Sequence, residues 1–294
     1  MKPAPFDYFA PDTVAEASAL LVQYGYDAKI LAGGQSLVPT MNFRLAQPAV
    51  LVDLNKIPDL DYIDSTSDGG LRMGAMTRQS TVERSALVAR HAPLLHEAMP
   101  LIAHRQIRNR GTIGGSLAHA DPAAELPVVA TALNARFGIR TLDGRERWVD
   151  AREFYIALFT TDLAPEEILT EVRIPPAPAR SGFAIQEVAR RHGDYAIVGA
   201  AAAVTLNDAG RCRDATLVYL SVGEGPVIAA QAGAMLHGQT PDDDLIRAAA
   251  HTAATADIDP TADIHASVAY RRFLAETLGR RVLQTAFARA GTEI

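Results

Sequence analysis

A short apolar segment followed by two glycines constrains this chain more than any other stretch. Residues 30–32 are apolar and predict a buried strand, Gly33 and Gly34 follow, and Ser36 stands where it could cap a helix over 37–41. A strand, a glycine turn and a helix start together present backbone N–H groups that suit a phosphate. Glycine is needed where a turn requires positive φ and where a ligand approaches the backbone closely. An ordinary strand-to-helix turn would produce the same pattern, so a second observation is required.

A second glycine-rich loop lies further along the chain. Residues 110–116 read Arg-Gly-Thr-Ile-Gly-Gly-Ser, and Asp121-Pro122 follows as an expected helix start with an N-cap and a proline at its first position. Two such loops suit a ligand with two linked phosphates. Neither loop matches G-x-G-x-x-G or G-x-x-x-x-G-K-[ST], so the common nucleotide-binding folds are not indicated.

Composition excludes several classes of function. The chain has 294 residues and a formal net charge of −6, which gives no basic footprint for nucleic acid. Its single cysteine, Cys212, can form neither an internal disulfide nor an iron–sulfur cluster, and no Cys/His spacing indicates zinc. We therefore expect no metal site and no catalytic triad on this chain. No apolar run approaches the ~18 residues of a membrane span, and a cytoplasmic protein is expected.

The order of predicted elements indicates an α+β chain of two domains. Residues 1 to about 57 predict a small parallel α/β unit, in which Thr13 caps the first helix. Residues 58–177 predict a mixed or antiparallel sheet with helices. The proline-rich segment 175–179 is the clearest linker, because proline cannot join the interior of a sheet. The predicted domains are therefore 1–177 and 178–294, the second with three antiparallel strands and a helix bundle.

The periodicity of apolar residues and the turn signals place the individual elements. Strands are predicted at 29–32, 49–54, 71–75, 136–141, 145–149, 168–174, 182–188, 196–206 and 216–222. Helices are predicted from residues 14 and 80, at 93–103, from 122 to about 133, and at about 226–235, 242–256 and 265–288.

Three motifs together resemble a known family. They are Ala32-Gly33-Gly34-Gln35-Ser36, Thr112-Ile113-Gly114-Gly115, and the Ala-Asp-Pro-Ala-Ala-Glu run from Ala120. They resemble the FAD-binding medium subunit of molybdenum hydroxylases, of which carbon monoxide dehydrogenase and xanthine dehydrogenase are familiar members. The resemblance runs from residues 6–11 to Tyr270-Arg271-Arg272, which is essentially the whole chain. It implies the same two-part FAD domain, followed by a three-stranded sheet with a helix bundle.

The resemblance also implies which residues bind FAD. Gly33, Gly34, Gln35 and Ser36 would hold the diphosphate on one side, and Thr112, Gly115 and Ser116 on the other. Ala32, Leu37, Ile102 and Ala118 would supply apolar walls. Further cofactor-binding positions are expected at Leu31, Gly114, Ala124 and Leu169. No catalytic residue is expected, because FAD carries the chemistry and the protein positions it.

Three polar residues have alternative roles. Asp121 and Glu125 could bond the ribose or adenine of FAD, or could simply cap a helix and offset its dipole. Tyr195 could stack on the isoalloxazine, or could be ordinary interface packing. Relatives often carry Ser before the proline and Asp at the position of Glu125, so the resemblance does not fix the individual contacts of Asp121 and Glu125. Some relatives carry Lys near Gln186, so a positive charge close to the flavin ring is expected to be missing here.

The expected function is that of an electron-transfer subunit. In the resembling family, electrons pass from molybdopterin on a large subunit through two [2Fe–2S] clusters on a small subunit to FAD, and then to an external acceptor. An oxidoreductase complex that is a dimer of heterotrimers is implied. The alternatives are a free-standing flavin oxidoreductase and a non-redox nucleotide-binding regulatory module. The sequence identifies neither the substrate nor the terminal acceptor.

Overall fold

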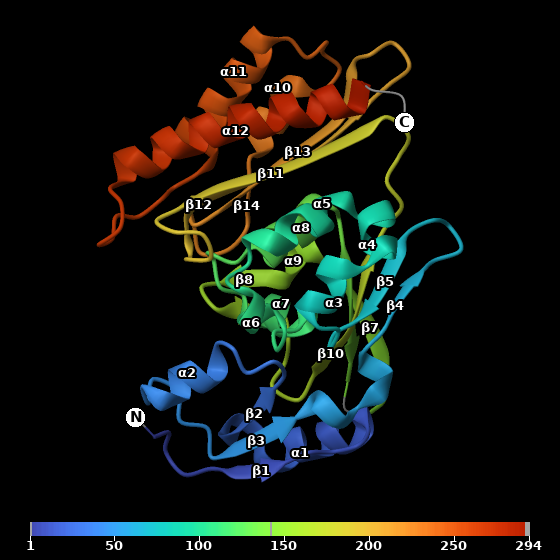
Figure 1. The fold of residues 1–294 in the computed structure, drawn as a ribbon, viewed down its shortest axis with the longest axis vertical. Coiled ribbons are helices and arrows are strands. Elements are labelled where there is room, and N and C mark those ends of the chain that lie inside the picture. The colour runs from blue at the N-terminus through green and yellow to red at the C-terminus, as the bar shows by residue number, and fades with distance from the viewer. Residues whose placement is uncertain (1, 142, 292–294) are drawn as a thin grey trace.

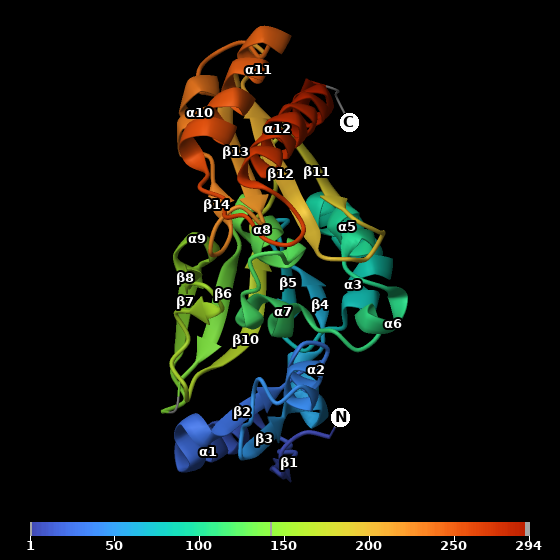
Figure 2. The same cartoon turned by 90° about the vertical axis from the view of Figure 1, so that its left-hand side faces the viewer.

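The computed structural model describes residues 2–141 and 143–291, and it contains three stacked parts. A small N-terminal unit lies at one end, a five-stranded unit with helices lies in the middle, and a sheet with a helical layer lies at the other end (Figure 1). The view at 90° shows the same order (Figure 2). The α+β class and this arrangement agree with the fold expected from the sequence.

The N-terminal unit is a three-stranded parallel sheet covered by one helix. Its strands pair in the order β1-β3-β2, and the neighbours are parallel. Thr13 caps helix α1 as predicted, since its side chain accepts a bond from the Glu16 N–H at 3.2 Å. The elements are β1 (Asp7–Phe9), α1 (Val14–Tyr24), β2 (Ala28–Leu31), α2 (Leu37–Asn42) and β3 (Val50–Asp53).

The middle unit is an antiparallel sheet in the order β4-β5-β10-β6-β7. Its strands are β4 (Ile63–Ser65), β5 (Leu71–Gly74), β6 (Arg136–Arg140), β7 (Glu146–Asp150) and β10 (Ile168–Ile174), and a small hairpin joins β8 (Tyr155–Ala157) to β9 (Thr160–Thr161). Its helices are α3 (Gln79–Arg84), α4 (Ala86–His91), α5 (Pro93–Ala98), α6 (Arg105–Arg108), α7 (Ile113–His119), α8 (Glu125–Ala132) and α9 (Ala151–Phe154).

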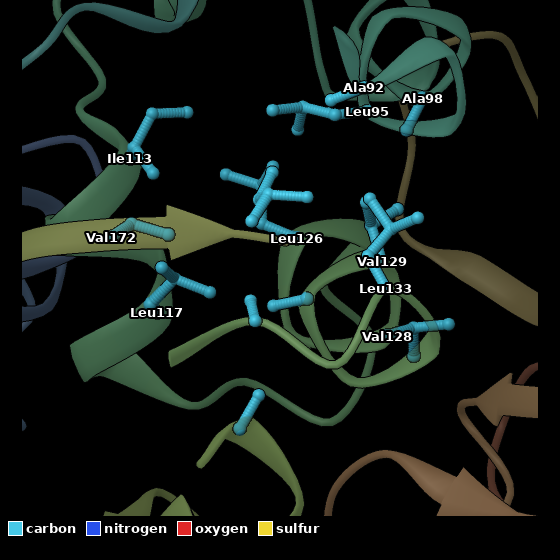
Figure 3. Packing of buried hydrophobic residues seen from close by; sticks show 14 of the residues in the cluster. Ala92, Leu95, Ala98, Ile113, Leu117, Leu126, Val128, Val129, Leu133 and Val172 are labelled. Atoms are coloured by element: carbon cyan, nitrogen blue, oxygen red, sulfur yellow. The ribbon is translucent and has the colours of Figure 1, made fainter. Parts of the chain in front are cut away.

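The core of the middle unit lies between its sheet and its helices. Leu117 of α7, Leu126 of α8 and Leu95 of α5 point toward one another beside Val172 of β10 (Figure 3). All four side chains are at most 3 % exposed. This packing fixes the start of α7 and the start of α8 relative to the sheet, and both starts carry predicted site residues.

The C-terminal sheet lies between two helical layers. Its order is β11-β12-β13-β14, and α5 and α8 pack on one face while α12 covers the other. The alanine-rich β12 allows α12 a close approach, and a Cβ on Gly182 of β11 would lie 1.9 Å from the Ala286 carbonyl of α12. The elements are β11 (Ser181–Ala189), β12 (Ala196–Leu206), β13 (Cys212–Leu220), β14 (Val227–Ile228), α10 (Ala230–Leu236), α11 (Asp243–Thr252) and α12 (Val268–Gly291).

Several predicted boundaries are wrong in detail. Helix α8 begins at Glu125 and not at Pro122, because the Asp121 side chain accepts a bond from the Ala123 N–H at 2.9 Å and forms a turn there. The segment predicted as one helix over 93–103 ends at Ala98 and is followed by a 3₁₀ turn to Leu101. Residues 227–228, predicted to be helical, instead add a short fourth strand beside Tyr219.

Candidate functional site

The first glycine loop is a row of free backbone donors at the carboxyl end of β2. The N–H groups of Gly33, Gly34, Gln35 and Ser36 have no acceptor in the part of the chain that the structure describes. Gly34 adopts φ +72°, which favours glycine, and the Gln35 side chain holds the loop by donating to the Gly33 carbonyl at 3.1 Å. Consecutive free N–H groups of this kind form an anion-binding nest.

Ser36 does not cap α2 through its side chain, so the predicted cap is wrong. Its backbone is already near-helical, with φ −102° and ψ −46°, and its hydroxyl makes no capping bond. Thr40 instead donates to the Ser36 carbonyl at 2.8 Å. The Ser36 hydroxyl is therefore available to a ligand at the loop.

The two glycine loops pack directly against each other. A Cβ on Gly33 would lie 2.4 Å from the Arg110 carbonyl oxygen and 2.7 Å from the Gly111 Cα. A Cβ on Gly115 would lie 3.2 Å from the Ala32 Cβ. The structure thus brings the two predicted loops together, although about eighty residues separate them in the sequence.

The second loop differs from the first because the protein already uses most of its donors. Thr112 accepts a bond from the Gly115 N–H at 3.1 Å, as the N-cap of α7. The Ile113 and Gly114 N–H groups donate to the carbonyls of Thr77 and Ala75 at 3.0 and 2.8 Å. Among the described residues, the Ser116 hydroxyl has no partner. This loop supports the first one and leaves Ser116 free to contact a ligand.

A substitution at Thr112 tests this supporting role. Thr112→Val keeps the shape of the side chain but removes the oxygen that caps α7, and Thr112 is buried. We expect a loss of about 1 kcal/mol in the free energy of unfolding, the usual value of such a cap. Urea titration measures this loss, and Thr112→Ser, which keeps the oxygen, should restore most of it. Equal stability of Thr112→Val and the wild type would show that the cap is not needed.

Sequence analysis missed two residues that join the loops. The Asn55 side chain donates to the Ala32 carbonyl at 2.8 Å. Arg78 donates to the Asn55 side chain and to the Arg110 carbonyl. These bonds connect three segments through tertiary contacts, and no local pattern around Asn55 or Arg78 indicates them.

The positive charges near the loops suit an anion. Partial burial, and then the charge of Arg110, lowers the pKa of the Arg78 guanidinium, so two arginines lie close enough to interact here. Lys29, on β2, acts on His119. A chain with a net charge of −6 therefore gathers cations beside its free N–H donors.

Helix α7 leads from the loops to the joint between the middle unit and the C-terminal sheet. Asp121 and Ala124 follow α7 and are half-buried, and Glu125 is 7 % exposed at the start of α8. The Ser221 N–H, after β13, donates to the Pro122 carbonyl at 2.8 Å and fixes this joint. The second group of predicted residues thus lies at one place between the two units.

Tyr195 lies at the same joint and is 70 % exposed. Partial desolvation and the charges of Asp121 and Glu125 raise its pKa, which places it within electrostatic reach of both carboxyls. The loop before it is held close to the loop after Ile102, since a Cβ on Gly193 would lie 2.4 Å from the His104 ring. The chain segments that carry Ile102 and Tyr195 therefore lie next to each other.

Burial changes the pKa of two side chains near this joint. It raises the pKa of Glu125 to about 7, and the charge of Asp121 adds to this effect. It lowers the pKa of His119, whose ring stacks on Phe159 with centroids 5.2 Å apart. Near neutral pH, the Glu125 carboxyl is therefore expected to be partly protonated and the His119 ring to be largely uncharged.

The remaining predicted residues divide into two groups. Leu31, Ala32, Leu37 and Ala118 are half-buried at the loops and along α7, where they can serve as walls. Gly114 and Leu169 are buried, Gly114 against Ala75 and Leu169 in the core at 5 % exposure. Their contact with a cofactor stays a prediction, as does that of every other predicted site residue.

The arrangement fits a dinucleotide with a diphosphate in its middle. The free N–H groups of residues 33–36 supply donors for the phosphates. At the joint, Tyr195 is exposed and supplies aromatic surface for a ring system, whereas Ile102 is buried at 8 % exposure. Among the described residues, no group of three or more His, Cys, Asp or Glu side chains could hold a metal ion.

Comparison with protein families matches both parts of the chain. A family model described as the FAD binding domain in molybdopterin dehydrogenase matches residues 4–177. A second model, the CO dehydrogenase flavoprotein C-terminal domain, matches residues 183–286. The domain limits predicted at 177 and 178 stay a prediction.

Individual proteins are similar over almost the full length. The chain is 46 % identical to the 6-hydroxypseudooxynicotine dehydrogenase complex subunit alpha of Paenarthrobacter nicotinovorans, over 99 % of this chain and 97 % of that one. It is 38 % identical to the carbon monoxide dehydrogenase medium chain of Afipia carboxidovorans, over 99 % of both. In the solved structure of carbon monoxide dehydrogenase from Hydrogenophaga pseudoflava, a chain 37 % identical superposes with a TM-score of 0.95 and covers 98 % of this chain and 99 % of that one.

Proposed function

The chain belongs to the FAD-binding medium subunits of molybdenum-containing hydroxylases, and we propose that it works within a dimer of heterotrimers. In this complex it would pass electrons through FAD to an external acceptor. Its relatives are subunits of dehydrogenase complexes, so its class is oxidoreductase. The observation that carries the proposal is the row of free N–H donors at residues 33–36, braced by the second glycine loop.

The residues of this chain would hold the cofactor in an extended form. The N–H groups of 33–36 and the hydroxyls of Ser36 and Ser116 would bind the diphosphate, while Asp121 and Glu125 would face the ribose or adenine. Ile102 and Tyr195 would lie beside the ring and limit access of water to it. FAD, when bound, supplies the redox chemistry of the subunit.

The partner subunits follow from the division of cofactors in the family. Molybdopterin and the iron–sulfur clusters belong to the other subunits of these complexes, and Cys212 is the single cysteine of this chain and is buried. A small [2Fe–2S] subunit and a large molybdopterin subunit are therefore proposed as partners. A cytoplasmic location is part of the proposal and agrees with the free thiol of Cys212. In the described residues, no helix has the length and hydropathy to cross a membrane.

Purification of the complex tests the proposal. We expect the chain, co-expressed with its proposed small and large partner subunits and isolated by a tag on this subunit, to carry bound FAD, molybdenum and iron in fixed ratios. Heat release with mass spectrometry identifies the flavin, and metal analysis measures the other two. Bound FAD without molybdenum or iron would indicate a free-standing flavin oxidoreductase, and the absence of any flavin would indicate a regulatory nucleotide-binding module.

A further inference from the structure

The backbone carbonyls of the first glycine loop are held by donors from the protein itself. The side chains of Asn55 and Gln35 donate to the carbonyls of residues 32 and 33 at 2.8 and 3.1 Å. The Val38 N–H donates to the carbonyl of residue 34 at 3.1 Å. Three consecutive carbonyls therefore have partners, whereas the N–H groups that follow them have no acceptor among the described residues.

This pattern sets the direction of the free N–H groups. A peptide unit is planar and trans, so the carbonyl of one residue and the N–H of the next point in opposite directions. A donor that fixes the Ala32 carbonyl therefore also fixes the direction of the Gly33 N–H. Asn55 holds that carbonyl, so it directs the first N–H of the row away from itself and toward the side where a ligand would lie.

The strand register explains how Asn55 reaches the loop. β2 and β3 are parallel neighbours, and Leu31 lies opposite Asp53. Asn55 therefore follows the end of β3 at the same edge of the sheet where Ala32 follows β2. The Asp53 side chain accepts a bond from the Asn55 N–H at 2.8 Å and another from the Asn55 side-chain amide. These bonds fix the backbone and the side chain of Asn55 in the turn.

Arg78 determines which end of the Asn55 amide faces the loop. One arm of its guanidinium donates to the Asn55 Oδ1 atom. Since arginine only donates and a backbone carbonyl only accepts, Oδ1 must face Arg78 and Nδ2 must face the Ala32 carbonyl. The other arm of Arg78 donates to the Arg110 carbonyl, whose oxygen would lie 2.4 Å from a Cβ on Gly33. One side chain thus holds both Asn55 and the part of the second loop that borders Gly33.

The backbone of Arg78 is itself joined to the second loop. Residues 77–79 pair in antiparallel fashion with residues 111–113, and the bridge of Arg78 lies at the centre of this pairing. The Gln79 N–H donates to the Gly111 carbonyl at 2.9 Å. The main chain of Arg78 therefore belongs to the second loop, while its side chain supports the first.

We infer that Asn55 and Arg78 are positioning residues for the diphosphate of FAD, in which Asn55 aims the Gly33 N–H and Arg78 fixes both Asn55 and the spacing of the two loops. This inference rests on the proposed function, in which the N–H groups of residues 33–36 bind the diphosphate. Hydrogen bonds weaken steeply when donor and acceptor are misaligned, so a row of donors binds an anion well only when its direction is fixed beforehand. Neither side chain has to touch the cofactor, because both act through the backbone.

The first test measures the dissociation constant of FAD for the full chain. Asn55→Leu has a similar size but no donor, so the Ala32 carbonyl is released. Asn207→Leu is the matched control, because the Asn207 side chain accepts two backbone N–H bonds at 3.0 and 2.9 Å in the turn between β12 and β13, away from the loops. We expect Asn55→Leu to raise the dissociation constant about tenfold or more, the value of one well-aimed bond to a charged group, and the control to leave it unchanged.

Urea titration of the same proteins separates affinity from stability. Both asparagine variants should lose unfolding free energy, since each removes side-chain hydrogen bonds, but only Asn55→Leu should lose affinity for FAD under conditions where all the proteins are folded. Equal dissociation constants for Asn55→Leu and the wild type would overturn the role of Asn55.

The second test separates positioning by Arg78 from simple attraction of its charge. Arg78→Lys keeps the charge but lacks the planar two-armed fork, and Arg78→Met removes both. We expect both variants to raise the dissociation constant of FAD by a similar factor, whereas Arg72→Met, which breaks an exposed ion pair with Asp64, should not change it. Wild-type affinity in Arg78→Lys would show that charge alone matters and would overturn the positioning role.

The double variant Asn55→Leu/Arg78→Met tests whether Arg78 acts through Asn55. Residues that act through one another are not additive, so the double variant should raise the dissociation constant by less than the product of the two single effects. An effect equal to that product would show two independent residues and would overturn the proposed connection.

Titration with ADP distinguishes failure of this inference from failure of the proposed function. ADP carries a diphosphate but no flavin. If the wild type binds ADP but not FAD, and the variants lose ADP affinity as described, the flavin assignment fails and the positioning pair stands. If every variant binds FAD as the wild type does, the pair fails and the proposed function stands. If the wild type binds neither ligand, both fail.

Discussion

Replacing Gly33 with alanine should abolish retention of FAD by the purified subunit. The new Cβ would lie 2.4 Å from the Arg110 carbonyl oxygen and 2.7 Å from the Gly111 Cα. Both atoms belong to the backbone of the second loop, so no flexible side chain can move away. The two loops must separate, and the N–H groups of residues 33–36 lose their common direction. Each charge-assisted hydrogen bond lost from a phosphate should weaken binding by roughly 10- to 100-fold.

Fluorescence titration with FAD and thermal unfolding together check this result. Gly225→Ala is the matched control, because its Cβ would meet Tyr155 at 3.6 Å, an ordinary contact. We expect the control to bind FAD as the wild type does and the Gly33 variant to bind none at micromolar concentrations. The C-terminal sheet of the Gly33 variant should remain folded. Stoichiometric FAD in Gly33→Ala would show that this loop does not hold the phosphates.

The two glycine loops could be recognised in the sequence because their signals are local, while their contact with FAD stays a prediction. An apolar strand, two glycines and a hydroxyl occur within nine residues at 29–37, and the second loop repeats the pattern. The sequence predicted glycine for a turn with positive φ and for the close approach of a ligand. Gly34 does have φ +72°, whereas the close approach that the structure shows at Gly33 and Gly115 is that of the opposite loop. Element types were predictable for the same reason, since strand alternation and helix periodicity are read over short windows.

The parts that sequence analysis missed depend on contacts between distant segments. Asn55 and Arg78 reach the glycine loops only because the N-terminal unit folds against the middle unit. The helix predicted to start at Pro122 begins later because Asp121 bonds locally to Ala123, a competition that a capping pattern alone does not resolve.

Replacing Arg108 with methionine should destabilise the protein by about 3–5 kcal/mol, the usual cost of breaking a buried ion pair. Arg108 is 8 % exposed and binds both carboxylate oxygens of Glu83 at 2.9 Å. It also donates to the Ile102 carbonyl at 2.8 Å and to the Ala103 carbonyl at 3.4 Å. The substitution leaves these acceptors unpaired. Since Ile102 belongs to the predicted wall of the flavin site, FAD affinity should fall as well.

The pH dependence of this loss separates the ion pair from simple packing. The bond from Arg108 lowers the pKa of Glu83 below its ordinary value of 4.5, so the pair contributes stability above that value and loses it as the pH falls through the lowered pKa. The difference in unfolding free energy between wild type and Arg108→Met should therefore be large at neutral pH and shrink in acid. Arg247→Met, which breaks an exposed pair with Asp244, should cost no more than about 0.5 kcal/mol at any pH. A difference for Arg108→Met that is the same at neutral and acid pH would mean that packing and the two carbonyl bonds, rather than the charge pair with Glu83, hold the loop after α5 in place.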